Sequence, residues 1–361
     1  MRTLLVLLLM VHGAIHLMGF AKGFDLGNVG QFSRDISRPM GLLWLVAGCL
    51  FLLAGFLYGF QKDSWAAVAL AAVVLSQGLI VATWADAKWG TLANALLLAF
   101  AVVAWASQRF EQRYAEAVQS ALQASAPAEE RLTESDLAHL PTLVQQYIRR
   151  SGALGKPKVR RMTLFFEGQM RDRGKDWFSF TAEQHSFFDR PARHFFMKAK
   201  IMGLPAYGYH AYTQGQARMQ VKLLSLFPVV AVEGPELSVA ETVTYFNDLC
   251  LFAPAALIDP RIAWEPHGER SVTAHFSYGK NRIAAVLHFN EAGQLVNFTS
   301  NDRLAVDQMK RHPFSTPVAR YRNFNGHELP GYGEAIWHYP EGAFVYGKFH
   351  LKDMAYNQGE R

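Results

Sequence analysis

The pattern of apolar residues changes near residue 107. Before that point, apolar residues form four stretches, each close to the roughly 20 residues that an α-helix needs to cross about 30 Å of hydrocarbon. Charged residues and turn formers separate the stretches, and tryptophans lie near their ends, as is typical of rings at a membrane interface. The stretches are residues 3–21, 40–60, 65–85 and 89–107. The pattern predicts a four-helix membrane anchor over residues 1–107.

A charged, helix-favouring segment follows the apolar stretches. Residues 108–132 are expected to form a connecting helix and a linker, and Pro141 to begin a short helix that ends near Gly152. From residue 158 onward, apolar and polar residues alternate with a period of two, which predicts strands. A longer helix over residues 238–252 interrupts them. The predicted strands are 159–170, 177–188, 194–202, 207–212, 218–224, 229–232, 262–265, 272–278, 282–289, 295–300, 319–323, 334–339 and 344–351.

These strands follow one another with short turns, which favours an antiparallel sheet. A sheet of about a dozen strands curls into an open barrel or half-barrel, and its concave face is either filled by a helix or holds a ligand. We therefore expect an N-terminal four-helix transmembrane bundle followed by an α+β soluble domain over residues 133–361. That domain is expected to be a large curved antiparallel sheet, an open half-barrel, with one or two covering helices.

Composition and motifs exclude several classes of function. The chain has 36 Lys and Arg and 30 Asp and Glu, and after residue 107 the two signs are interspersed, so no clustered basic face is available for nucleic acid. Its two cysteines, Cys49 and Cys250, lie in different parts and are not expected to pair. We find no nucleophile elbow, phosphate loop, zinc-binding cysteine pair or dinucleotide fingerprint. No catalytic residue or metal site is predicted, and the cofactor is unknown.

Polar residues within the apolar stretches are candidates for function, because polar groups are costly in hydrocarbon. His12 and His16 are four residues apart and share one helix face, and Gln77 lies at a comparable depth to His12 in the third stretch. Three interpretations stay open: hydrogen bonds that hold the helices together, a quinone-type redox site, and a metal or haem site. The candidate membrane polar cluster is His12, His16, Arg38, Gln77, Asp86 and Lys88.

The candidate site of the soluble domain rests on the interrupting helix and on aromatic residues. Glu241, Tyr245 and Asp248 share one helix face, which either lines a cavity mouth or is solvated. Aromatic residues in the strands either form the core or line a lipid-sized cavity. The candidate ligand-binding residues are Glu183, Glu241, Tyr245, Asp248, Trp264 and Trp337, with His185 and His210 as further titratable residues. Other candidates for an apolar lining are Phe165, Phe178, Phe180, Phe187, Phe195, Phe276 and Phe289.

Several longer motifs resemble a family of bacterial membrane proteins of unknown function, domain of unknown function 6544. In the first part these are HGAIHLMGFAK at 12–22, ISRPMGLLW at 36–44 and WADAKWGT at 84–91; later ones are TAEQ at 181–184, YFND at 245–248, PAAL at 254–257 and WH at 337–338. This resemblance implies no activity. The expected helix and curved sheet also look like the lipoprotein-carrier domains of the bacterial envelope. That second resemblance implies a domain that binds acyl chains in its concavity, outside the cytoplasm.

Together these features suggest a membrane-tethered binding module for a lipid or other apolar ligand at the bacterial cell envelope, with membrane lipids as partners. Such a module requires no enzymatic step. Equal numbers of basic residues flank the two ends of the apolar stretches, so the positive-inside rule does not orient the chain. The carrier resemblance implies a multi-pass protein of the bacterial inner membrane with an extracytoplasmic soluble domain. The alternative is a redox or quinone/haem-associated membrane protein that uses His12 and His16. A structural or signalling role is a third hypothesis.

Overall fold

A computed structural model describes residues 2–27, 29, 33, 35–127 and 129–358. By the contacts between its residues the chain divides into two compact units, Met1–Phe110 and Glu111–Arg361. Each unit is described by itself.

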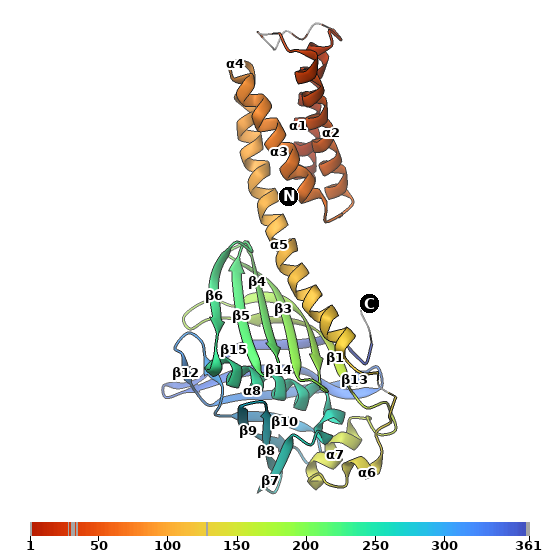
Figure 1. Cartoon of the computed structure of the whole chain (residues 1–361). Helices are drawn as coiled ribbons and strands as arrows, with labels where there is room; N and C mark the ends of the chain where they lie inside the picture. Colours follow the sequence, from red (N-terminus) through yellow and green to blue (C-terminus); the bar gives the residue numbers. More distant parts are fainter. Residues whose placement is uncertain (1, 28, 30–32, 34, 128, 359–361) are drawn as a thin grey trace. The chain divides into compact units, whose positions relative to one another are not determined.

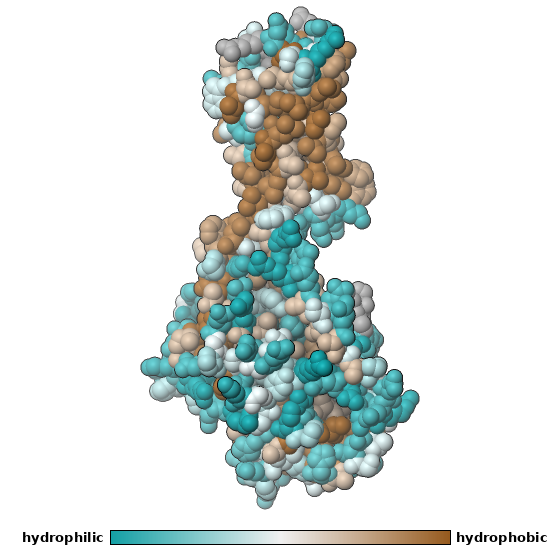
Figure 2. All heavy atoms as spheres, viewed as in Figure 1, coloured by the Kyte–Doolittle hydropathy of each residue, from teal (hydrophilic) through white to brown (hydrophobic). Residues whose placement is uncertain are grey.

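The first unit is helical. It contains α1 (Arg2–Gly23), α2 (Arg38–Gly59), α3 (Trp65–Ala82), α4 (Trp84–Ala87) and the first part of α5 (Gly90–Ala124). Within the described residues, four helices are long and apolar enough to cross a membrane: α1, α2, α3 and α5. Figure 2 shows the apolar surface that they present. The third apolar stretch does not stay one helix to residue 85. It ends at Ala82, where the hydroxyl of Thr83 donates to Leu79 O (2.8 Å), and α4 follows as a separate turn.

The second unit is α+β, as expected. Besides the end of α5 it has the helices α6 (Glu134–Leu137), α7 (Thr142–Arg150) and α8 (Pro235–Phe252) and the 3-10 helix η1 (Pro254–Ile258). Its strands are β1 (Arg161–Met170), β2 (Phe178–Phe187), β3 (Ala192–Ile201), β4 (Leu204–Thr213), β5 (Gln216–Leu223), β6 (Phe227–Glu233), β7 (Ile262–Gly268), β8 (Ser271–Tyr278), β9 (Asn281–Phe289), β10 (Leu295–Ser300), β11 (Leu304–Ala305), β12 (Lys310–Arg311), β13 (Phe314–Phe324), β14 (His327–Tyr339) and β15 (Gly342–Tyr356).

In the described part of the chain, thirteen strands form one antiparallel sheet in the order β6-β5-β4-β3-β2-β1-β15-β14-β13-β10-β9-β8-β7. The sheet is curved and open, which confirms the expected half-barrel (Figure 1). In the middle of the sheet, β1 pairs with β15, so the first and the last strand of the unit are neighbours. The last three strands are longer than predicted, and the short hairpin of β11 and β12 was not predicted, because its two-residue strands carry no periodic pattern.

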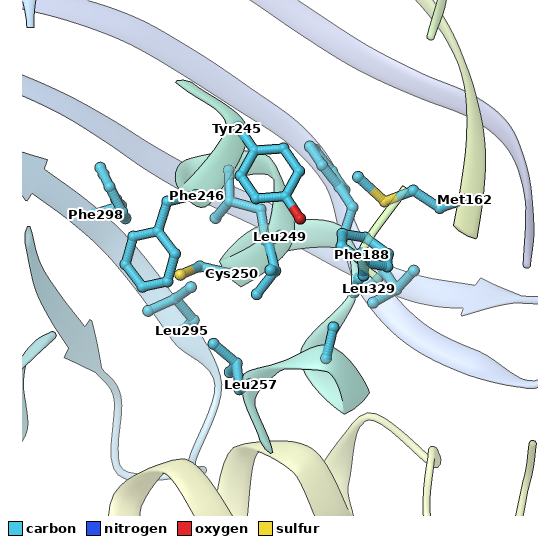
Figure 3. Packing of buried hydrophobic residues seen from close by; sticks show 14 of the residues in the cluster. Met162, Phe188, Tyr245, Phe246, Leu249, Cys250, Leu257, Leu295, Phe298 and Leu329 are labelled. Atoms are coloured by element: carbon cyan, nitrogen blue, oxygen red, sulfur yellow. The ribbon is translucent and has the colours of Figure 1, made fainter. Parts of the chain in front are cut away.

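Helix α8 packs on the concave face of the sheet and forms the centre of the core. Fifteen of its 18 residues are buried. The ring of Phe246 stacks on Phe276 of β8, with centroids 5.2 Å apart. Leu249, on the same helix, is fully buried (Figure 3). A helix that is buried on nearly all sides, with its polar groups paired inside, is part of a core rather than of a surface. The concavity is therefore filled by α8 along the length of that helix.

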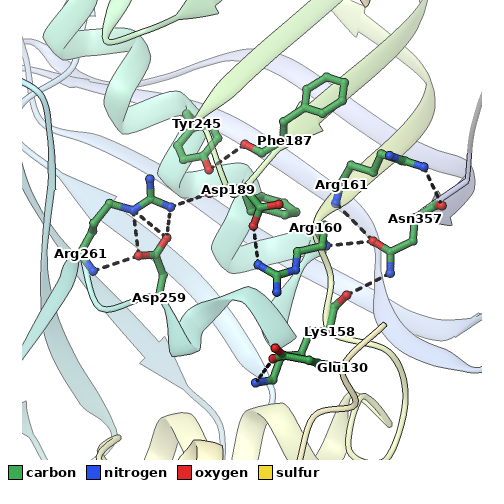
Figure 4. Close-up of polar contacts among 11 residues, drawn as sticks. Glu130, Lys158, Arg160, Arg161, Phe187, Asp189, Tyr245, Asp259, Arg261 and Asn357 are labelled. Atoms are coloured by element: carbon green, nitrogen blue, oxygen red, sulfur yellow. Dashed lines mark hydrogen bonds and ion pairs between the residues drawn. The ribbon is translucent and has the colours of Figure 1, made fainter. Parts of the chain in front are cut away.

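Polar contacts fix the turn between β2 and β3 to the rest of the unit. The hydroxyl of Tyr245 donates to Phe187 O (3.1 Å), and Arg261, paired with Asp259, donates to Phe188 O (2.5 Å) (Figure 4). Arg160 pairs with Asp189 at 2.6 Å. The bond from Tyr245 joins α8 to this turn, and the other two contacts join the turn to the segments around Arg261 and Arg160.

The end of α5 packs on the outer, convex face of the sheet. Tyr114 is buried there and stacks on Phe196, with centroids 5.2 Å apart, and meets Tyr209 edge-on. Lys198 of β3 forms an ion pair with Glu111. The part of α5 that begins the second unit thus runs along β3 and β4.

Candidate functional site

The pairing of β1 to β5 arranges the side chains of the concave face in four rows, which together we call the inner face. From the α8 end they are Met162, Ser186, Arg193, Tyr212 and Ala217; then Leu164, Gln184, Phe195, His210 and Met219; then Phe166, Ala182, Met197, Gly208 and Val221; then Gly168, Phe180, Ala199, Ala206 and Leu223. The first two rows carry polar groups. The third and fourth are apolar, with small residues at several positions.

Helix α8 crosses the inner face at the first two rows. The hydroxyl of Thr242 donates to Tyr212 Oη (2.9 Å), and the backbone N–H of Ala217 donates to Ser238 Oγ (3.0 Å). Strand β4 continues for eight residues beyond Tyr212 toward Leu204, which is roughly 26 Å at the rise of a strand. The third and fourth rows lie along that length.

Arg193 is the centre of a buried charged cluster between the sheet and α8. Its Nε lies 2.6 Å from Asp248 Oδ2, and its Nη1 lies 3.5 Å from Glu241 Oε2. Gln184 Nε2 also donates to Asp248 Oδ2 (3.0 Å). All four side chains are buried, but Arg193 Nη1 and Glu241 Oε2 have no hydrogen-bond partner among the described residues. A buried charge with an incomplete set of hydrogen bonds is costly, so the missing hydrogen bonds of these two atoms require an explanation.

His210 and Tyr346 lie beside this cluster. Burial lowers the pKa of His210 to about 4; the charge of Glu241 raises it, and those of Arg193 and Arg303 lower it further. Burial also raises the pKa of Tyr346. The charges of Arg303 and Arg193 lower this pKa, and those of Glu241 and Asp248 raise it. Both side chains nevertheless keep part of their surface exposed. They are thus surrounded by protein and still reachable by small molecules.

An aromatic cluster lies next to Tyr346. Trp337 of β14 stacks on Tyr346, with centroids 5.8 Å apart, and meets Phe314 of β13 edge-on at 5.2 Å. The guanidinium of Arg303 lies over the ring of Phe314 at 4.4 Å. The inner face and the aromatic cluster beside it together contain buried charge, a half-buried histidine and apolar rings. This is the composition of sites that bind amphipathic small molecules.

The structure brings together only some of the predicted ligand-binding residues. Glu241 and Asp248 meet at Arg193, and Trp337 belongs to the aromatic cluster beside it. Tyr245 is wholly buried, and its hydroxyl is used by Phe187 O. The face of α8 that carries Glu241, Tyr245 and Asp248 is therefore packed against the sheet, not solvated.

Glu183 and Trp264 lie elsewhere. Glu183 points to the outer face, where its Oε1 is 2.9 Å from His185 Nε2; burial and the charge of Glu183 raise the pKa of the nearby Tyr114. Trp264 is half-buried on the edge strand β7, at the other end of the sheet order. Of the other aromatic candidates, Phe180, Phe195, Phe276 and Phe289 all belong to the buried core cluster, and the first two of them lie on the inner face.

Arg193 and Tyr346 were not predicted as site residues. For Arg193 a signal existed: it shares the parity of Phe195 and Met197, so a charge stands on the apolar side of a strand. The predicted strand began at residue 194, one residue too late to include it. Tyr346 lies near an irregularity between β14 and β15, where the period of two fails, so no pattern indicated its face.

In the first unit, His12, His16 and Gln77 join one hydrogen-bonded network through Ser76 and Asn94. His12 Nε2 lies 2.9 Å from Asn94 Oδ1, and His16 Nε2 lies 2.8 Å from Ser76 Oγ. Asn94 Nδ2 donates to Ser76 Oγ (2.9 Å) and to Gln77 Oε1 (3.1 Å). The network connects α1, α3 and α5, and hydrogen bonds of this kind between apolar helices favour their association.

The remaining members of the predicted membrane polar cluster lie apart from this network. Asp86 accepts hydrogen bonds from Ser33 N (3.0 Å) and Ser33 Oγ (2.8 Å). Lys88 lies over the ring of Trp89, 5.8 Å from its centroid, and Arg38 is exposed at the start of α2. Among the residues that the structure describes, no group of three His, Cys, Asp or Glu side chains is placed to hold a metal ion.

The structure thus defines an α+β protein with an open, curved antiparallel sheet, preceded by four helices that could span a membrane. The chain belongs to the Family of unknown function (DUF6544), whose model matches residues 130–349. This confirms the family expected from the sequence. No curated protein matches the chain.

Two solved structures show a distant likeness. A LolA superfamily protein from Nitrosomonas europaea has a TM-score of 0.36 and 7% sequence identity, with coverage of 61% of this chain and 94% of the other. A beta-barrel-like protein of domain of unknown function DUF1849 from Brucella abortus has a TM-score of 0.17 and 7% identity, with coverage of 55% and 98%.

Proposed function

We propose that the second unit is a binding module for an amphipathic molecule with an acyl chain, held on the inner face beyond α8. The observation that carries the proposal is the incomplete pairing of Arg193 Nη1 and Glu241 Oε2 inside the fold. Buried polar groups in native proteins nearly always have partners, and exceptions require an explanation. A ligand head group that both accepts from Arg193 and donates to Glu241 would complete the pairing.

The rest of the inner face suits the tail of such a molecule. Its third and fourth rows are apolar. They include the small residues Ala182, Ala199, Ala206 and Gly208, whose side chains extend little from the sheet. At Gly208 an added Cβ would lie 3.5 Å from Met197 Cε and Val221 Cγ2, which is ordinary contact, so side-chain volume is missing there without being excluded. Burial of an alkyl chain contributes about 0.8 kcal/mol per CH₂ group, which suffices for binding without any chemical step.

The candidate spans would keep the unit beside the source of such a ligand, the membrane lipids. The proposal includes the location expected from the sequence, a bacterial inner membrane with this unit outside the cytoplasm. A cysteine placed at the exposed Gln214, in a chain with Cys49→Ser, should then react with a membrane-impermeant maleimide on spheroplasts. Labelling only after lysis would contradict that location.

The binding proposal is tested on the full chain with a photoreactive phospholipid that carries a diazirine in its acyl chain. After illumination and digestion, mass spectrometry should find the lipid on peptides of β3–β5. In Gly208→Trp the indole would occupy the inner face, and labelling of these peptides should fall severalfold. Thr181→Trp is the matched control, because Thr181 is exposed and lies on the outer face of β2.

Both variants keep the anchor, so lipid that binds to the helices of the first unit is common to them. Labelling confined to α1–α5 in the wild-type chain would overturn the proposal. Equal labelling of β3–β5 in Gly208→Trp and Thr181→Trp would overturn the placement of the ligand on the inner face. The thermal unfolding of each variant shows whether the comparison is between folded proteins.

A further inference from the structure

Six large apolar side chains are exposed together at the ends of β3 to β6 that lie away from α8. They range from 37% exposed for Ile201 to 96% for Met202. The turn from β3 to β4 and the turn from β5 to β6 are neighbours, since Leu224 N donates to Pro205 O (2.7 Å) (Figure 1). We call this surface the apolar rim: Ile201, Met202, Leu204, Leu226, Phe227 and Val229.

The geometry of the turns does not require these apolar residues. Met202 and Gly203 form the turn between β3 and β4, both with positive φ (51° and 81°). At the other end of β4, Gln214 and Gly215 form the equivalent turn with nearly the same angles (54° and 74°) and a polar first residue. Polar residues are usual at such positions. A methionine that is almost wholly exposed at this site therefore indicates a surface that is covered by something apolar.

Basic residues surround the apolar rim. Lys200 is exposed one residue before Ile201, and Lys198 lies two residues earlier. Lys222 of β5 and Arg113 of α5 are close enough that the charge of Arg113, after burial, lowers the pKa of Lys222. Apolar side chains within a basic border are typical of surfaces that meet the acyl chains and phosphate groups of a bilayer.

The course of α5 supports the same partner. Glu111 pairs with Lys198, and three residues later Tyr114 stacks on Phe196, so α5 enters the second unit at the rim end of β3 and runs away from it. The same helix contains the fourth candidate span. Only a few residues of helix, each with a rise of about 1.5 Å, separate Glu111 from the end of the apolar stretch at residue 107. The chain therefore enters the second unit at the rim end of β3 only a few residues after the apolar stretch.

We propose that the apolar rim inserts into the interface of the lipid bilayer, with its basic border against lipid phosphates. The partner is the bilayer in which the chain is anchored. This surface does not depend on a ligand on the inner face, because none of the rim residues belongs to the charged cluster at Arg193. It would still let acyl chains reach the inner face from the membrane.

The test uses the full chain in nanodiscs of phosphatidylcholine and phosphatidylglycerol, with Cys49→Ser. Met202→Cys and Gln214→Cys are labelled in turn with an environment-sensitive NBD dye; Cys250 is buried. The two positions are matched, since they occupy the same place in equivalent turns at opposite ends of β4. We expect the label at 202 to emit at shorter wavelength and to be quenched severalfold by lipids with a nitroxide on the acyl chain. The label at 214 should show neither effect.

Water-like emission at both positions would overturn the proposal. A blue-shifted label at 202 that lipid nitroxides do not quench would also overturn it, because a protein surface, such as a second copy of the chain, would then cover the rim. Phe227→Ser combined with Leu226→Ser should reduce the quenching at 202, since it removes two of the inserting side chains. Photolabelling of β3–β5 by lipid is a separate readout, so the two proposals can fail independently.

Discussion

Arg193 Nη1 and Glu241 Oε2 face each other at 3.5 Å inside the second unit, and neither atom has a hydrogen bond among the described residues. On the same guanidinium, Nε forms a hydrogen-bonded ion pair with Asp248 Oδ2 at 2.6 Å. Two acids seven residues apart on α8 therefore pair differently with one arginine. Asp248 forms the close ion pair, and Glu241 lies farther from the guanidinium and forms no hydrogen bond through Oε2 among the described residues.

This difference predicts unequal effects of the two acids on stability. Asp248→Ala leaves a buried arginine without its main partner and should lower the free energy of unfolding by about 3–5 kcal/mol. Glu241→Gln keeps the shape and loses a weakly paired charge, so it should change that free energy by about 1 kcal/mol or less. Thermal and denaturant unfolding of the full chain measure both. Equal losses would mean that Glu241 is as fully paired as Asp248.

His210 predicts a dependence of stability on pH. Its pKa in the folded protein is about 4, below the ordinary 6.5, chiefly because burial disfavours the charged imidazole. Between pH 6.5 and 4 the unfolded chain therefore binds a proton that the folded chain does not, and stability falls as the pH falls, by up to about 1.4 kcal/mol per pH unit. His210→Gln should reduce this slope. His194 and His327, whose pKa values are also lowered to about 4, remain as a background in the variant. An unchanged dependence of stability on pH in His210→Gln would mean that the His210 side chain is exposed to solvent in the folded protein.

Tyr245 predicts a separation of stability from binding. Its hydroxyl donates to Phe187 O inside the core, so Tyr245→Phe should lower the free energy of unfolding by about 1–1.5 kcal/mol. Photolabelling of the inner face should stay at the wild-type level. Tyr207→Phe, at the half-exposed end of β4, is a control that should stay within about 0.5 kcal/mol. Loss of lipid labelling in Tyr245→Phe but not in Tyr207→Phe would mean that Tyr245 contacts the ligand.

Close packing of α1 on α2 predicts that an added methyl group destabilises the protein at Gly19 of α1 but not at Gly78 of α3. A Cβ at Gly19 would lie 2.3 Å from Trp44 Cδ2, whereas a Cβ at Gly78 would meet nothing within 4 Å. Gly19→Ala should destabilise the helices by about 1–3 kcal/mol because the Trp44 ring must move. Gly78→Ala should be neutral or stabilising by up to about 1 kcal/mol. Thermal unfolding in detergent compares them, and equal midpoints would show that α1 and α2 pack differently.

Asn94 predicts the contribution of the membrane polar network. Asn94→Leu removes the hydrogen bonds to His12, Ser76 and Gln77 and should cost about 1–2 kcal/mol. The Thr83 hydroxyl donates within its own helix, to Leu79 O, so Thr83→Val should have a smaller effect. The same detergent unfolding assay measures both. A stabilised Asn94→Leu variant would show that the network serves something other than cohesion.

Much of the fold could be predicted because its signals are local. Four apolar stretches of spanning length are visible without any tertiary contact, since the hydrocarbon thickness alone fixes the length of a span. The alternation of the buried Leu164 and Phe166 with less buried neighbours likewise fits a strand, because one face of the sheet is more buried than the other. The open half-barrel expected from these patterns is confirmed, and so is the family that the longer motifs resemble.

The candidate site depended on contacts between distant segments. Nothing local to Arg193 shows that it will meet Asp248, 55 residues later, because that meeting requires α8 to cross the sheet at the first row of β3. Glu183 and Gln184 are neighbours in sequence but lie on opposite faces of β2, and only the position of α8 decides which face is the inner one. The sequence by itself determined the apolar helices and the alternating strands, since both follow from the burial of individual residues. The tertiary structure alone decided which charges are buried together, because burial of a charge depends on partners that pairing and packing bring from elsewhere in the chain.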